Sequence, residues 1–132
     1  MSIARAALVV AGVVLVAGCG APPADLFVVD RTGNVPGAKL NMLVSDGSVR
    51  CNGGPEHEIT SQQLLRGRAI AAALEEVEQS DIPPGRPQIF GFRVRSEFGT
   101  IRFADTTTRP EVLPQLVLLV RELARDECRL QR

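Results

Sequence analysis

Few residues of this chain have the types and spacing that acid–base or metal chemistry needs. His57 is the only histidine, and it lies between Glu56 and Glu58 in a segment rich in glycine and proline. Imidazole and carboxylate groups can bind zinc, but adjacent side chains point in different directions, and no second histidine completes a common zinc set. The sequence therefore predicts a solvated loop histidine and no metal site.

Nucleophilic and carboxylate catalysis also lack a complete set of residues. A serine nucleophile needs a positioned base, and Ser61 and Ser96 have only His57 as a possible imidazole partner. Paired carboxylates could serve a glycosidase, but the acids within residues 75–78 fall on the polar side of a predicted helix. The segment CNGGP lacks the lysine of a phosphate-binding loop. We therefore predict a protein that is not an enzyme and uses no cofactor.

Three arginines form the most concentrated charge that the sequence places on one surface. Arg93, Arg95 and Arg102 alternate with apolar residues, so they project from one face of a predicted hairpin. The opposite face carries Phe90, Phe92 and Phe103. Clustered guanidinium groups can bind carboxylates or phosphates through paired donors, and near a bilayer they can meet anionic headgroups. The alternative is an ordinary charged sheet face neutralised by Glu97 and Asp105.

Composition narrows the class of partner. The 132 residues contain 15 basic and 15 acidic side chains, and neither tryptophan nor tyrosine. A neutral chain argues against nucleic acid as the main partner, and the missing aromatic residues leave few platforms for stacking bases or sugars. The length suits one small domain.

The strands that must position these residues follow from hydrophobic alternation. DLFVVDRTG (25–33) predicts a strand, and GNVPG (33–37) predicts a turn. The segment 38–45 alternates apolar and polar residues, which is typical of a half-buried strand. Asp46 and Gly47 form a hairpin signal, so Ser48–Cys51 returns as a short strand. We expect 51–58 to be a loop.

Helical spacing marks two further segments. Thr60 and Gln63 match a capping box, and the helix that follows is expected to end at DIPPGRP, since proline cannot continue a helix. QIFGFRVRSEFGTIRFAD predicts a second hairpin, and PEVLPQLVLLVRELARDEC predicts a helix with a wide apolar stripe. The order of meander, helix, hairpin and helix predicts an α+β fold, a single antiparallel sheet with both helices packed on one face.

The N-terminal residues indicate export. Arg5 precedes an apolar run, and small residues follow it, as in a signal peptide. The segment VAGC, which ends at Cys19, resembles the lipobox of bacterial lipoproteins. The resemblance implies cleavage before Cys19 and a diacylglycerol on its sulfur. The alternative is an uncleaved N-terminal anchor helix.

This resemblance divides the chain into three parts. Residues 1–18 form the signal peptide, residues 19–24 hold the lipid-anchored cysteine and a short linker, and residues 25–132 form the small α+β domain. The protein would then be attached to the cell membrane by its lipid, on the extracytoplasmic face.

Lipidation also bears on the other cysteines. The chain has three, and if Cys19 carries lipid, Cys51 and Cys128 remain as an even pair. Disulfides persist in the oxidising compartments that exported proteins reach, so we infer a Cys51–Cys128 bond. Two free buried thiols are the alternative.

The mature domain has a second resemblance. VDRTG, then SDIPPGRPQIFGFRVRSEFGTIRFAD, and finally RPEVLPQLVLLVREL follow one another within residues 29–125. In this order they resemble the emfourin-type inhibitors of thermolysin-like metalloproteases. The resemblance implies a non-enzymatic, protein-binding domain. It adds a turn to the candidate partner-binding residues, which comprises Thr32, Gly33, Asn34, Val35, Pro36 and Gly37.

The sequence thus predicts a membrane-anchored lipoprotein with a small, non-catalytic protein-binding domain. Its partner would contact the three arginines or the 32–37 turn. The alternative is a protease inhibitor of the emfourin type tethered at the cell surface. An envelope hydrolase is disfavoured by the missing catalytic set.

Overall fold

The computed structural model describes residues 24–77, 82–83 and 85–130. The predicted signal peptide, Cys19 and all of the linker before Ala24 lie outside the described residues. The elements are β1 (Asp25–Gly33), β2 (Leu40–Ser45), β3 (Ser48–Cys51), β4 (Glu56–Glu58), α1 (Ser61–Ala73), the 3₁₀ turn η1 (Leu74–Glu76), β5 (Phe90–Ser96), β6 (Gly99–Ala104) and α2 (Val112–Asp126).

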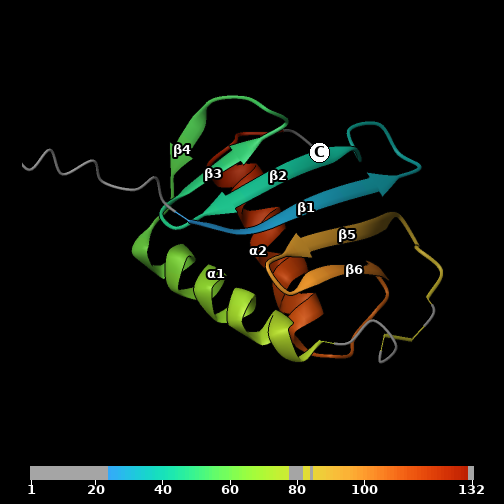
Figure 1. Ribbon diagram of the computed structural model, residues 1–132. Coiled ribbons are helices and arrows are strands. Elements are labelled where there is room, and N and C mark those ends of the chain that lie inside the picture. The colour runs from blue at the N-terminus through green and yellow to red at the C-terminus, as the bar shows by residue number, and fades with distance from the viewer. Residues whose placement is uncertain (1–23, 78–81, 84, 131–132) are drawn as a thin grey trace, which may run out of the picture.

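The strands form one sheet in the order β4-β3-β2-β1-β5-β6 (Figure 1). Every neighbouring pair is antiparallel. The N-terminal strand β1 lies in the middle, where it joins the meander to the β5–β6 hairpin. The predicted α+β fold with a single antiparallel sheet is confirmed.

Both helices pack on one face of the sheet, as predicted (Figure 1). Gly67 of α1 lies so close to β2 and α2 that an added Cβ would stand 3.8 Å from Val44 and 4.0 Å from Leu119. The strands turn alternate apolar side chains toward this layer. The largest fully buried side chains are Phe27, Leu40, Met42, Leu113, Leu116, Leu119, Leu123, Val29, Val44, Val49, Val94 and Val120.

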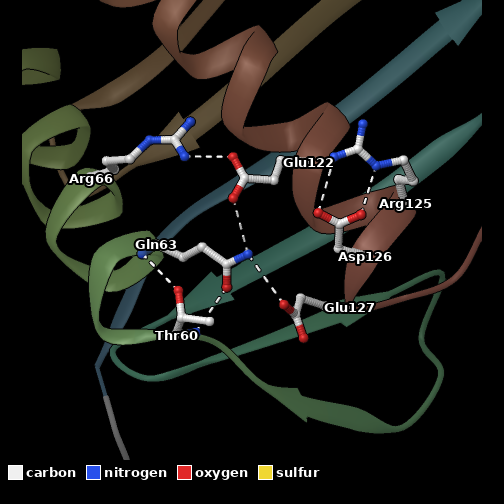
Figure 2. Close-up of polar contacts among 7 residues, drawn as sticks. All are labelled: Thr60, Gln63, Arg66, Glu122, Arg125, Asp126 and Glu127. Carbon is white, nitrogen blue, oxygen red and sulfur yellow. Dashed lines mark hydrogen bonds and ion pairs between the residues drawn. The ribbon is translucent and has the colours of Figure 1, made fainter.

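Polar contacts join the first turn of α1 to the last turns of α2 (Figure 2). The Thr60–Gln63 capping box is present as predicted. The buried side chain of Gln63 also donates to Glu122 and Glu127, at 3.2 Å each, and Arg66 forms an ion pair with Glu122. Gln63 therefore takes part in the capping box of α1 and also joins α1 to α2.

The predicted loop at 51–58 is wrong in part, because Glu56–Glu58 forms the edge strand β4 and pairs with Ser48–Arg50. The cause is a tight turn. Asn52 and Gly53 both have positive φ, 53° and 67°, and the Gly54 N–H donates to the Cys51 carbonyl at 2.9 Å. Such turns match the twist of a hairpin and reverse the chain at once.

The first helix ends earlier than predicted. After Ala73 the chain tightens into η1, and Val77 is already extended at φ −85° and ψ 104°. The helix therefore stops before the proline-containing segment, so proline is not the residue that ends it. Among the described helices, none is both long and apolar enough to cross a membrane.

Candidate functional site

The three predicted arginines stand together on the sheet face that the helices leave open. Arg93 of β5 is directly opposite Arg102 of β6, and Arg95 is two residues further along β5. All three are exposed, whereas Phe92 and Phe103 on the other face are buried and stack with ring centroids 5.2 Å apart. The alternation of the sequence places these side chains correctly.

The acid beside the arginines is Asp30 of β1, rather than Glu97 or Asp105. Its Oδ2 accepts from Arg93 Nη2 at 2.8 Å and Nε at 3.2 Å, and Arg95 Nη2 lies 3.5 Å away. Burial alone would raise the pKa of Asp30. The hydrogen bonds from Arg93 and Asn41 and the charges of both arginines outweigh that effect, so the pKa lies below its ordinary value.

Asp105 instead organises the backbone at the start of β5. Its carboxylate accepts from the N–H groups of Gln88, Ile89 and Phe90 at 2.8, 2.8 and 3.0 Å. Burial would raise the pKa of Asp105, but these backbone donors outweigh it and lower the pKa. The carboxylate is therefore ionised at neutral pH, and it holds the backbone of residues 88–90 in place.

A groove of about 640 Å³ opens on this sheet face. Its floor includes Asp30, Thr32, Gly91, Arg93 and Arg102, and its wall includes Ile82, Pro83, Gly85 and Pro87. We call this the arginine groove. It brings together two surfaces predicted separately, because Thr32 of the predicted turn lines it beside two of the three arginines. Arg95 and the remaining turn residues are not among its lining residues.

The 33–37 turn is fixed at its base and exposed at its tip. Arg31 donates to the carbonyls of Ala38, at 2.8 Å, and Gly37, at 3.3 Å, and its guanidinium lies 4.7 Å from the Phe90 ring centroid. A Cβ at Gly33 would stand 2.6 Å from the Ile89 carbonyl oxygen, so only glycine fits there. Val35 is 43% exposed. The turn is thus hydrogen-bonded at its base and projects into solvent at its tip.

Arg31 is the arginine of this region that points toward the helices. Burial, and secondarily the charge of Arg121, lower its pKa. Its donors are directed at backbone carbonyls and its plane covers an aromatic ring, an arrangement typical of a structural arginine. Neither Asp30 nor Arg31 was among the site residues predicted from the sequence. The alternation of apolar and polar residues in β1 could have placed Asp30 on the polar face. No local sequence pattern, however, predicts that β1 pairs with β5.

The other chemically capable residues lie away from the groove. His57 faces the helix side of β4 beside Glu127 and Arg129. In the part of the chain that the structure describes, no group of three or more histidine, cysteine, aspartate or glutamate side chains could hold a metal ion. Cys51 and Cys128 form the predicted disulfide across a sequence separation of 77 residues.

No protein family, curated protein or solved structure matches this chain. The candidate site therefore rests on its own geometry.

Proposed function

We propose that this chain is a membrane-anchored bacterial lipoprotein whose small domain binds another protein and catalyses no reaction. The observation that carries the proposal is the open sheet face with its arginine groove. Asp30, at this face, and Asp105, at the start of β5, have lowered pKa values and serve arginines and backbone donors respectively. General acids and bases usually have pKa values shifted toward neutrality, so the site favours binding over catalysis.

The disulfide supports the anchoring part of the proposal. It uses two of the three cysteines, and a bond of this kind persists in an oxidising compartment. Cys19 is then the cysteine left to carry lipid, and the VAGC segment supplies the small residues that a lipobox requires.

The experiment is the change Cys19→Ser. Two acyl chains anchor a protein stably where a single chain is marginal, so the variant should move from the detergent phase to the aqueous phase in detergent partitioning. The double variant Cys51→Ser/Cys128→Ser is the matched control and should stay in the detergent phase. Full recovery of Cys19→Ser in the detergent phase, with its N-terminal segment intact, would instead identify an uncleaved anchor helix.

A tethered protease inhibitor is the second candidate, and the exposed 33–37 turn, which Arg31 holds at its base, favours it. In protease–inhibitor complexes the interface backbone usually moves little on binding. Assays of thermolysin-like proteases with the purified chain separate the two functions. Inhibition that is lost in Asn34→Gly/Val35→Gly but kept in the triple Arg93/Arg95/Arg102→Ser variant would place function in the turn.

A further inference from the structure

The arginine groove holds two like charges in direct opposition. Arg93 and Arg102 are register partners, and like charges directly opposite in a sheet destabilise it. Arg93 uses Nε and Nη2 on Asp30, and within the described residues Arg102 makes no ion pair. An anion bound between the two guanidinium groups would relieve this repulsion.

The charge of the groove favours an anionic ligand. Two arginines and one aspartate line it, and Arg95, just outside the lining, reaches the same aspartate at 3.5 Å. Positive charge is therefore in excess here. A carboxylate of the ligand can bind Arg102, because a guanidinium and a carboxylate form two parallel hydrogen bonds.

The wall of the groove indicates what accompanies the carboxylate. Ile82, Pro83 and Pro87 are apolar and line the groove together with the arginines. A volume of about 640 Å³ falls in the range that holds a drug-sized ligand, so the groove accommodates a few residues rather than a whole protein surface. In a peptide segment with an acidic side chain next to an apolar one, the acidic side chain can contact the arginines and the apolar side chain can contact the wall.

We propose that the arginine groove binds an extended peptide segment in which an aspartate or glutamate is flanked by an apolar residue. Arg102 and Arg93 hold the carboxylate, Asp30 positions Arg93, and the wall of the groove covers the apolar side chain. This inference rests on the proposed protein-binding function and specifies the chemistry of the partner.

The test uses the full chain in detergent micelles and hexapeptides that carry an uncharged dye. In each peptide one glutamate is flanked by leucine or proline, and a matched peptide has glutamine at that position. Fluorescence anisotropy should show binding of the glutamate peptides. Their glutamine copies should bind at least about tenfold more weakly, as expected for loss of a charged hydrogen bond.

Two variants assign the binding to the groove. Arg102→Gln should weaken the glutamate peptides about tenfold, while Arg50→Gln, the same change on the exposed β3 arginine outside the groove lining, should leave them unchanged. Gly91→Ala keeps every charge but adds a methyl group 3.4 Å from Thr32 Oγ1, and it should weaken binding by narrowing the floor. Urea unfolding of each variant checks its fold.

Three outcomes overturn the inference. The first is equal binding of glutamate and glutamine peptides, and the second is equal loss in Arg50→Gln and Arg102→Gln. The third is Arg102-dependent binding to vesicles of phosphatidylcholine and phosphatidylglycerol in equal parts without peptide binding, which would make a headgroup the ligand. The membrane partitioning of Cys19→Ser does not depend on any of these outcomes. The lipoprotein proposal can therefore be correct even if the groove does not bind an acidic peptide.

Discussion

At the scale of single residues, Asp105 lies outside the lining of the arginine groove but orders the backbone that leads into it. Asp105 follows β6 in sequence but holds the backbone of 88–90, at the start of β5. The same short segment leads into Gly91, which forms part of the groove floor. One carboxylate therefore fixes the entry of a strand whose side chains have to face a ligand.

We expect Asp105→Asn to destabilise the fold by about 1–3 kcal/mol, since an amide cannot accept from three backbone donors as a carboxylate does. Its NH₂ group would also face those donors. Urea unfolding measures the loss, and hydrogen exchange should accelerate at residues 88–90. Glu97→Gln in the exposed β5–β6 turn is the control. An unchanged urea midpoint for Asp105→Asn would contradict the assigned role.

At the scale of elements, the polar network between α1 and α2 makes their alignment sensitive to acid. The hydrogen bond from Arg66 lowers the pKa of Glu122, although burial opposes it. A group with a depressed folded pKa stabilises the protein above its unfolded pKa and loses that contribution as pH falls through the folded value. The helix pair should therefore be held most firmly above pH 4.5, the ordinary value for glutamate.

The change Glu122→Gln tests this dependence. Because both partners are partly exposed, we expect it to cost only about 0.2–1 kcal/mol at neutral pH. The difference from wild type should shrink as pH falls below 4.5. Unfolding free energies measured across that range give the comparison, and Glu75→Gln on the exposed side of η1 serves as control. A constant difference at every pH would exclude the ionised form of Glu122 as its source.

The elements also differ in how far sequence could predict them. Alternation in the β5–β6 hairpin placed Arg93, Arg95 and Arg102 correctly, because both strands are joined by a short turn. The pairing of β1 with β5 brings Asp30 to Arg93 across 63 residues, and no local pattern reports such a contact. The groove wall formed by Ile82, Pro83, Gly85 and Pro87 was missed for the same reason, since proline and glycine spacing predicts where a helix stops and not where the next segment packs.

At the scale of the whole molecule, the disulfide connects the meander to the end of the last helix. Cys51 closes β3 and Cys128 lies just beyond α2, 77 residues later. On the chain-entropy account, a loop of this length stabilises the folded state by about 4.5 kcal/mol. The bond thus joins the end of β3 to the segment that follows α2.

Replacing both cysteines by alanine should lower the free energy of unfolding by about 2–5 kcal/mol. Denaturant unfolding without reductant measures the loss, and the unreduced parent protein should show no alkylation at Cys51 or Cys128. The parent with added reductant should unfold like the double variant. Full alkylation of both residues in freshly isolated, unreduced protein would contradict the bond.

The central position of β1 has a mechanical consequence. The strand follows directly on the segment that would carry the tether, and it is paired along six register positions with β2 and six with β5. Antiparallel hydrogen bonds run perpendicular to the strands, so a pull along β1 loads both ladders in shear and spreads the force over many bonds at once. An edge strand pulled outward would instead peel away one pair at a time. If Cys19 is the membrane anchor, a partner bound in the groove would therefore transmit force to it through β1, a strand that is hydrogen-bonded on both sides.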